Sequence, residues 1–370
     1  MSIIAYFISD HGFGHASRSI AIIRSLLECD LEISIEIHTS SPLSFVQRSF
    51  SQNEEPPRVQ FHKQMNDIGF IGNETTGKID YQSTAKEVSL WINDWHTSYI
   101  FEEYRYLKSK NIDLIISDIA PQPFLLAKKL DLPSIAISNF TWLDIYQNPA
   151  FKLGDLEAVW KAYREASLGL MLPFNLDNTV FCSAMETNLV SRPPSRTKQQ
   201  MREILNLDSG EQVVYLGTGF SFKTPFLDKW TKKNEFQLII GGQHEVLHPK
   251  IRAVPLSDSE GQDYIACSDI ALIKLGYSSL AEAIRSHVPI IGIDFPQTAE
   301  TKEMKKIVED LGIGLCITSE DFFQGKWQDL LPKVADMKQN FSHLPDRFVK
   351  HGESQIAGFI LDLLDEICSV

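Results

Sequence analysis

The stretch that decides the fold lies in the second half of the chain, where residues 269–283 read DIALIKLGYSSLAEA and residues 288–295 read VPIIGIDF. Each piece contains a short, nearly continuous apolar run, which is typical of a buried strand. Between the two runs, residues 276–279 (GYSS) indicate a turn that opens a helix. A strand, a helix and a second strand in this order form the repeating unit of a parallel sheet covered by helices on both faces.

The same alternation extends over the rest of the chain. Further buried strands are predicted at residues 3–9, 33–38, 112–117, 133–138, 212–216, 236–240 and 314–317. Helical spacing of apolar residues predicts helices at residues 15–28, 197–206 and 346–370. A polar stretch with two prolines, residues 191–196, separates the two series of strands. The sequence therefore predicts an α/β protein with an N-terminal domain at 1–190, a C-terminal domain at 191–345 and a terminal helical segment at 346–370.

The composition is that of an acidic globular protein. The 370 residues contain 35 Lys and Arg against 48 Asp and Glu, so the formal net charge is −13, and 43% of the residues are hydrophobic. A hydrophobic share of this size excludes a wholly disordered or fibrous chain. The negative charge argues against nucleic acid as a partner, because its phosphates are bound by clustered Lys and Arg.

The sequence shows neither a membrane anchor nor the marks of an oxidising compartment. No apolar run approaches the roughly 18–20 residues that a membrane-spanning helix needs, and no basic leader precedes the first strand. The five cysteines are scattered and form no C-x-x-C pair, so neither a zinc site nor a disulfide framework is indicated. We therefore expect a cytoplasmic protein without a transmembrane segment. A homodimer stays open.

An aromatic-rich stretch at residues 50–110 interrupts the alternation of strands and helices. Its aromatic side chains are Phe61, Phe70, Tyr81, Trp91, Trp95, Tyr99, Phe101, Tyr104 and Tyr106. These side chains fit two interpretations, an aromatic core beneath a long insertion or the wall of a substrate cleft. The sequence leaves both open.

In each half of the chain, a glycine-containing loop follows the first predicted strand. Open α/β sheets bind ligands at such strand ends. The first loop, residues 10–18, reads DHGFGHASR, and the second, residues 216–221, reads LGTGFS. Glycine lets the backbone turn tightly and lets a ligand approach, and a following helix directs its N–H groups to the same place. The first loop lacks the third glycine of the dinucleotide fingerprint G-x-G-x-x-G. Both loops are also compatible with plain strand-to-helix turns.

The residues around Gly276 resemble those of the GT-B glycosyltransferases. In that fold a strand is followed by the helix start G-x-x-[ST]-x-x-E, here Gly276, Ser279 and Glu282, and then by a second strand. This segment is similar to the signature of plant UDP-glycosyltransferases and to the lipid-linked GlcNAc transferases. Over residues 1–365 the chain also resembles the glycosyltransferase-like N-terminal domain of plant L-arabinokinases, which shares the HGFGHA loop, Ser117-Asp118, the NFTW turn at 139–142 and the core around Lys274.

The resemblance implies a GT-B fold, with two Rossmann-like, doubly wound parallel-sheet domains facing across a cleft and the terminal helix bracing the N-terminal domain. It also implies that the C-terminal domain binds a nucleotide sugar, with a UDP-linked sugar expected. Lys274 would contact the diphosphate, Glu282 the ribose and Glu300 the sugar hydroxyls. The other donor-binding candidates belong to the glycine loops and the helix start, namely Gly14, Gly217, Thr218, Gly219, Gly276, Tyr277, Ser278 and Ser279.

The three charged donor candidates each have a structural alternative. Glu282 is also compatible with a solvated helix carboxylate, and Lys274 with a surface lysine at a strand end. The loop before Glu300 is two residues longer than in the plant pattern. Whether Glu300 is the residue that aligns with the sugar-binding position of that pattern therefore stays open.

By the same resemblance, His15 is the candidate general base and Asp118 the carboxylate that orients it. A histidine can take the proton of an acceptor hydroxyl as this hydroxyl attacks the anomeric carbon, and a carboxylate partner fixes the tautomer. His11 competes with His15 for this role, and Asp118 is also compatible with a strand-end cap. No D-x-D motif occurs in the sequence, which favours a mechanism without a metal or another cofactor.

The sequence therefore predicts an inverting, metal-independent glycosyltransferase of the hexosyltransferase class. Its partners would be a nucleotide-sugar donor and an acceptor whose identity the sequence does not reveal. Two alternatives remain on the same fold. One is a nucleotide-sugar 2-epimerase or hydrolase, and the other is a nucleotide-sugar-binding module without catalysis.

Overall fold

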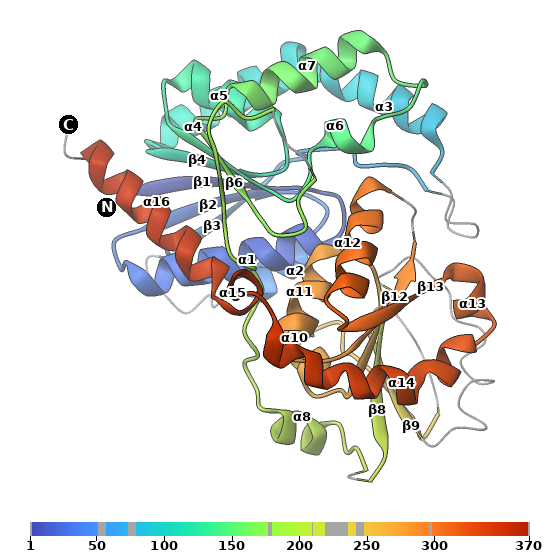
Figure 1. The fold of residues 1–370 in the computed structure, drawn as a ribbon. Coiled ribbons are helices and arrows are strands. Elements are labelled where there is room, and N and C mark those ends of the chain that lie inside the picture. Colours follow the sequence, from blue (N-terminus) through green and yellow to red (C-terminus); the bar gives the residue numbers. More distant parts are fainter. Residues whose placement is uncertain are drawn as a thin grey trace. The chain divides into compact units, whose positions relative to one another are not determined.

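The computed structural model describes residues 2–50, 57–72, 79–176, 180–208, 210–218, 236–241, 248–295 and 298–368. These residues form two compact units, shown as a ribbon in Figure 1. The N-terminal unit comprises the described residues up to 72, residues 79–190 and those from Lys350 onward. The C-terminal unit comprises the described residues of 191–349.

The described part of the N-terminal unit contains a seven-stranded parallel sheet in the order β3-β2-β1-β4-β5-β6-β7. The strand order reverses between β1 and β4, because the chain runs outward to β3 and then returns to the other side of β1. Ligands of open α/β sheets bind beside the carboxyl ends of the two strands at such a reversal. The strands are β1 (Ile3–Ile8), β2 (Ser34–Thr39), β3 (Val59–Lys63), β4 (Leu114–Asp118), β5 (Ser134–Ser138), β6 (Leu168–Met171) and β7 (Ala184–Glu186).

Helices cover both faces of this sheet. Figure 1 shows α1 (Phe13–Cys29) and α16 (Gly352–Cys368) side by side on the face opposite α4 (Ile100–Lys110) and α5 (Gln122–Leu130). Phe7 of β1, Leu107 of α4 and Leu126 of α5 are buried together in one apolar cluster. The other described helices of this unit are α2 (Leu43–Arg48), α3 (Tyr81–Asp94), the π-helix η1 (Trp95–Tyr99), α6 (Trp142–Ile145) and α7 (Leu153–Arg164).

The described part of the C-terminal unit contains a six-stranded parallel sheet with the order β10-β9-β8-β11-β12-β13. Here the strand order reverses between β8 (Gln212–Gly217) and β11 (Ile270–Lys274). The other strands are β9 (Phe236–Gly241), β10 (Ile251–Ala253), β12 (Ile290–Asp294) and β13 (Gly314–Thr318). The described helices are α8 (Lys198–Ile204), α10 (Gly261–Ala266), α11 (Tyr277–Arg285), α12 (Ala299–Asp310), α13 (Ser319–Phe323), η3 (Lys326–Leu330), α14 (Leu331–Asp336), η4 (Met337–His343) and α15 (Asp346–Val349).

The aromatic-rich stretch supplies mainly core. Trp91 and Trp95 are buried in a large aromatic cluster, and Tyr99 is buried in the cluster beneath α4 and α5. Phe101, in contrast, is 59% exposed. The stretch also contains the edge strand β3, which the sequence did not reveal because His62 and other polar residues interrupt its apolar pattern.

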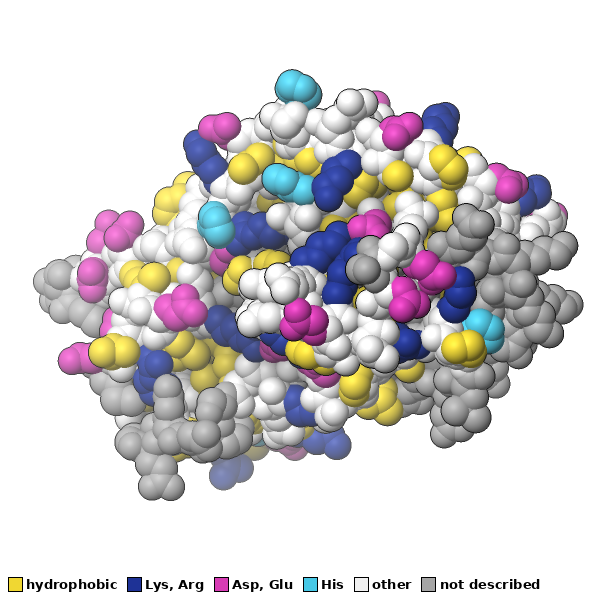
Figure 2. Space-filling view, turned by 90° about the horizontal axis from the view of Figure 1, so that it is seen from below, with side chains coloured by type: hydrophobic (Ala, Val, Ile, Leu, Met, Phe, Trp, Pro, Cys, Tyr) yellow, Lys and Arg dark blue, Asp and Glu magenta, His cyan; other side chains and the backbone are white. Residues whose placement is uncertain are grey.

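No helix of the described residues combines the length and apolarity that crossing a bilayer requires. On the face drawn in Figure 2, the described acidic and basic side chains are interspersed, with hydrophobic side chains between them.

Candidate active site

The first candidate site lies at the strand reversal of the N-terminal unit. The loop after β1 leads into α1, whose N-cap residue, Gly12, has a φ of 78°. Glycine adopts this left-handed conformation without steric strain, so it allows the abrupt change of direction from strand to helix. His15 follows in the first turn of α1 and is buried. Asp118 is the last residue of β4 and pairs with Ile8 of β1, so the sheet places it beside the same loop.

The structure brings His15 and Asp118 into direct contact. Nδ1 of His15 lies 2.8 Å from Oδ1 of Asp118, and Asp118 is completely buried. Nε2 of His15 has no hydrogen-bond partner among the described residues. His11 is placed differently, because its ring packs against Phe70 and the edge of Trp142. Of the two competing histidines, His15 is therefore the one that Asp118 orients.

Arg18 is a third member of this site, and we did not single it out in the sequence. Its Nε and Nη2 donate to the two carboxylate oxygens of Asp118 at 2.7 and 2.6 Å. Its Nη1 donates to Oδ1 of Asn139 at 2.5 Å. His15 and Arg18 are three positions apart, which places both side chains on one face of α1. This spacing within the HGFGHASR loop was the available signal.

The contacts among His15, Arg18 and Asp118 restrict where protons can lie in this site. Burial alone would raise the pKa of Asp118, but the charge of Arg18 and the contact with His15 outweigh burial and lower it to about 2. Asp118 is therefore an anion at neutral pH. Nη2 of Arg18 also lies 2.9 Å from Nδ1 of His15. A guanidinium can only donate, so Nδ1 of His15 either donates to Asp118 or accepts from Arg18. Only the first arrangement leaves Nε2 as a proton acceptor.

Two carboxylates, Asp10 and Asp67, anchor the loop that carries His11. Asp10 accepts from the backbone N–H groups of Ser40, Ser41 and Asn66. Asp67 accepts from the N–H of Asp10 and from Nε1 of Trp142. Burial and the nearby Asp10 charge raise the pKa of Asp67 to about 7. No motif in the sequence marks Asp67, which joins this loop only through the tertiary fold.

The second candidate site lies at the strand reversal of the C-terminal unit. Gly276 is the N-cap of α11 in an extended conformation, and the next two residues, Tyr277 and Ser278, are buried in the first turn. Ser279 is half-buried. No side chain caps this helix end among the described residues. The first turn of α11 therefore has the polarity that favours an anion.

Glu282 is buried rather than solvated, so the interpretation as a solvated helix carboxylate is wrong. Its Oε1 accepts from Nη2 and Nε of Arg192 at 2.9 and 3.0 Å, and both residues are almost inaccessible to solvent. Nη1 of Arg192 donates to the carbonyl of Ser259 at 2.5 Å. Arg192 lies in the polar stretch that separates the two series of strands, so its proximity to α11 was not visible in the sequence.

The remaining donor candidates lie around the same strand ends. Lys274 is half-buried at the end of β11. Burial lowers the pKa of Lys274, while the charge of Glu300 in the first turn of α12 raises it, so these two candidates interact. A Cβ atom at Gly217 would lie 2.6 Å from the Tyr215 ring, which explains this glycine by packing alone.

The second glycine loop is only partly described. Thr218 is buried, and its hydroxyl has no hydrogen-bond partner among the described residues. Gly219 lies outside the described residues. In the first loop, Gly14 is exposed in the first turn of α1.

Solved structures of several glycosyltransferases share this architecture. The complex of Arabidopsis thaliana UGT89C1 with UDP matches with a TM-score of 0.67 at 12% identity and covers 100% of both chains. The glycotransferase of kitacinnamycin matches with a TM-score of 0.67 at 13% identity and covers 97% of this chain and 98% of its own. This chain has the GT-B glycosyltransferase fold. The prediction of two Rossmann-like, doubly wound parallel sheets is thus confirmed.

Sequence comparison places distant relatives beside this GT-B chain. L-arabinokinase of Arabidopsis thaliana is 24% identical over 342 residues, which is 91% of this chain. The chain spans about a third of the length of that relative, with 32% of it covered. An uncharacterized glycosyltransferase of Methanosarcina acetivorans is 24% identical over 338 residues, 84% of each chain. No protein-family profile matches the chain.

Each unit of this GT-B chain contains its own group of polar side chains at the strand reversal. The N-terminal group contains His15, and Asp118 orients one of its ring nitrogens. This arrangement is typical of a general base. The C-terminal group combines a helix N-terminus with Lys274, which is an arrangement that can hold a diphosphate.

Proposed function

We propose that this GT-B chain is a glycosyltransferase that moves a sugar from a UDP-linked donor to an acceptor hydroxyl. The observation that carries the proposal is the contact of His15 with Asp118 at the strand reversal of the N-terminal unit. A GT-B fold alone does not fix an activity. A buried histidine whose Nδ1 faces an ionised carboxylate adds the element that proton transfer from a hydroxyl requires.

In the proposed mechanism, Asp118 accepts a hydrogen bond from the Nδ1–H of His15 and thereby leaves Nε2 able to accept a proton. The acceptor hydroxyl gives its proton to Nε2 while its oxygen forms a bond to the anomeric carbon. The bond between that carbon and the diphosphate oxygen breaks, and the electron pair leaves with UDP. Attack opposite to the leaving group inverts the anomeric centre. The resulting imidazolium is stabilised by the negative charge of Asp118.

Arg18 sets the strength of this base. Because it neutralises much of the charge of Asp118, the carboxylate orients His15 without holding the transferred proton too tightly. Arg18 also competes for Nδ1, so binding of an acceptor would have to favour the state in which His15 donates to Asp118. We propose Arg18 as a positioning residue.

The donor would be bound by the C-terminal unit. The first turn of α11 and Lys274 would stabilise the diphosphate without a metal ion, as its charge increases when the sugar leaves. Glu282 would reach the ribose with the carboxylate that Arg192 holds in place, and Glu300 would contact the sugar. A UDP-hexose is the donor class we propose, supported by the similarity in fold to UGT89C1, which was solved with UDP.

The two roles can be separated by substitution. His15→Ala should lower kcat by roughly 10²–10⁴-fold, because general-base catalysis is lost, and leave UDP affinity nearly unchanged. Asp118→Asn should lower kcat less, because the base remains. Steady-state rates with one accepted acceptor, together with calorimetric titration of UDP, test both. Full activity of His15→Ala would place the base elsewhere, and loss of UDP binding would assign the glycine loop to the phosphates.

The donor half of the proposal rests on Glu282. Glu282→Gln keeps the shape of the side chain but removes the charge that strengthens hydrogen bonds to ribose, so UDP binding should weaken by roughly 1.5–3 kcal/mol. Glu309→Gln, exposed on α12 of the same unit, is the matched control and should bind UDP like the unchanged chain. Hydrolysis of a UDP-sugar without acceptor would instead favour a hydrolase, and tight binding without turnover would favour a binding module.

A further inference from the structure

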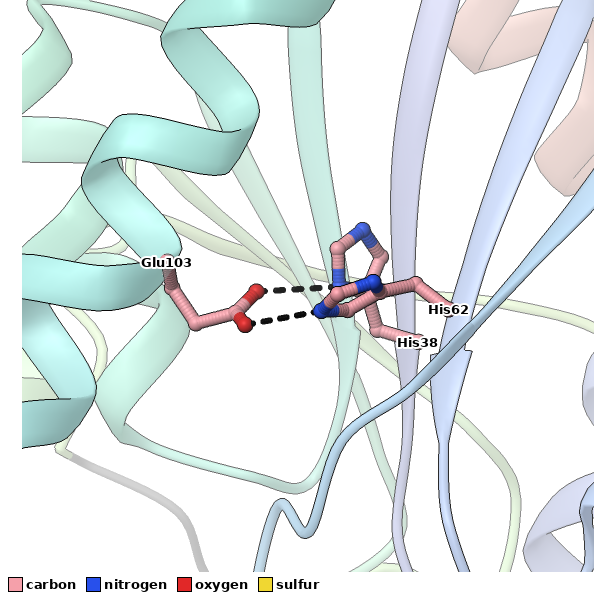
Figure 3. Close-up of side chains that lie close together, drawn as sticks. All are labelled: His38, His62 and Glu103. Atoms are coloured by element: carbon pink, nitrogen blue, oxygen red, sulfur yellow. Dashed lines mark hydrogen bonds and ion pairs between the residues drawn. The ribbon is translucent and has the colours of Figure 1, made fainter.

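A group of three potential metal ligands lies at the edge of the N-terminal sheet, away from the His15 site in the strand order. We call it the His38 cluster, and it consists of His38 of β2, His62 of β3 and Glu103 of α4. His38 and His62 are register partners in the parallel pairing of β2 with β3, so their side chains leave the sheet on the same face. Glu103 comes from the helix that covers this face. Figure 3 shows the three side chains converging.

The ligand atoms are already close to the spacing that a metal ion requires. Nδ1 of His38 lies 3.2 Å from Oε2 of Glu103, and Nε2 of His62 lies 2.9 Å from Oε1. One ligand atom from each residue falls within 4.8 Å of the other two. Zinc–ligand distances of about 2.0–2.1 Å place tetrahedral ligand atoms roughly 3.3 Å apart. The cluster therefore needs only small side-chain adjustments to surround one ion.

The cluster is enclosed but not sealed. His38 is completely buried and Glu103 is 3% exposed, whereas the side chain of His62 is 25% exposed. Phe7 stacks on His38 with ring centres 4.3 Å apart, and Tyr106 stacks on His62 at 3.9 Å. These contacts fix the two imidazole rings, and the partial exposure of His62 provides an entry path for an ion and a bound water.

The hydrogen bonds of the cluster are incomplete among the described residues. Neither ring nitrogen of His38 makes a hydrogen bond of good geometry with a described residue, although both are buried. The nearby carboxylate Glu36 does not balance the cluster, because it is negative and is itself paired with Lys110 and Tyr106. A bound cation would be a partner for one buried ring nitrogen of His38 and for Oε2 of Glu103, neither of which makes a hydrogen bond with a described residue.

We propose that His38, His62 and Glu103 bind one zinc-class divalent ion, with a water in the fourth position. Two imidazoles and one carboxylate form a ligand set that Zn²⁺ accepts in tetrahedral geometry. The ion joins the edge strand β3 to its neighbour β2 and to α4. It is separate from donor binding and from the reacting groups. No pattern in the sequence indicated this site, because its ligands come from three different elements and form no spaced motif such as C-x-x-C.

Titration of the metal-free 370-residue chain with Zn²⁺ tests this site directly. Calorimetry should show one ion bound per chain, and saturation should raise the unfolding temperature. Titration with Co²⁺ should produce visible absorption of a tetrahedral complex without the near-ultraviolet thiolate band that cysteine ligands would cause.

The decisive variants are His62→Gln and Glu103→Gln. Glutamine at residue 62 can still donate to Glu103 but is a poor zinc ligand, so Zn²⁺ affinity should fall at least tenfold while the chain remains folded. His343→Gln, an exposed histidine in the C-terminal unit, is the matched control and should bind like the unchanged chain. Absence of saturable binding overturns the proposal, as does binding that is equally tight in both cluster variants. These readouts do not depend on glycosyl transfer, so failure here leaves the proposed activity untouched.

Discussion

At the scale of single residues, the buried charges are compensated by partners distant in the sequence. Asp118 is neutralised by Arg18, and Glu282 by Arg192. Each carboxylate would be costly in the interior without its guanidinium. The same contacts that make burial tolerable also fix the orientation of the proposed functional groups.

The Arg18 contact should be essential for stability as well as for orientation. Among the described residues, Arg18→Met leaves the buried Asp118 with His15 and Ser19 as its side-chain hydrogen-bond partners, so the free energy of unfolding should fall by roughly 3–5 kcal/mol. Arg24→Met, on the same helix, removes a hydrogen bond to the carbonyl of Ser49 and should cost less. Urea unfolding of both variants checks this. Equal losses would show that Arg18 does not compensate Asp118.

Glu103 should contribute to stability in a pH-dependent way. A carboxyl group whose folded pKa lies below its unfolded value stabilises the fold above the unfolded value and loses that contribution as the pH falls towards the folded value. For Glu103 the window runs from 4.5 to about 2, which corresponds to roughly 3 kcal/mol. Glu103→Gln in EDTA should therefore lose less stability than the unchanged chain between pH 5 and pH 2.5. Urea unfolding at each pH measures this. An equal loss of the free energy of unfolding in both proteins over this pH range would contradict the prediction.

At the scale of elements, α16 shows how a terminal helix becomes part of a unit formed mostly by earlier residues. It packs beside α1, and the N–H of Gly352 donates to the carbonyl of Leu189 at 2.9 Å. The predicted helical segment at 346–370 is divided in the structure into α15 and α16, with residues 350 and 351 between them. The close approach at Gly352 requires a residue without a Cβ atom, because such an atom would lie 2.2 Å from the carbonyl oxygen of Asn188.

Two glycines of α16 should respond in opposite ways to alanine. Gly352→Ala should lower the free energy of unfolding by roughly 1–3 kcal/mol, because the backbone must move away from Asn188. Gly358→Ala should raise it by about 0.5–1 kcal/mol, because a Cβ atom there meets no described atom within 4 Å and alanine favours the helix. Thermal and urea unfolding measure both. Destabilisation by Gly358→Ala would show that the helix surface there is packed.

At the scale of the whole molecule, two units repeat one architectural rule. Each has a parallel sheet whose strand order reverses once, and each places its candidate functional residues at that reversal. The N-terminal unit contains the histidine of the proposed mechanism, and the C-terminal unit contains the helix start proposed for the diphosphate. The proposed division of labour therefore follows the division into units.

Donor use should not require a metal ion. If α11 and Lys274 stabilise the diphosphate, kcat/KM for the UDP-sugar should be unchanged in EDTA. The assay is carried out on the His62→Gln variant as well as on the unchanged chain, because this variant lacks one ligand of the His38 cluster. Loss of activity in both proteins that Mn²⁺ restores would contradict metal-independent donor binding. Loss only in the unchanged chain, restored by Zn²⁺, would trace the effect to the His38 cluster.

The sequence by itself determined the fold class, because short apolar runs separated by helical patterns have few solutions other than covered parallel sheets. The resemblance of its motifs to those of GT-B glycosyltransferases also identified His15 and Asp118 as candidates. Only the tertiary structure brought Arg18 and Asp118 together, placed Arg192 on Glu282 and assembled the His38 cluster. The physical reason is that periodicity reports which face of an element is buried, whereas strand order and register decide which buried polar groups meet.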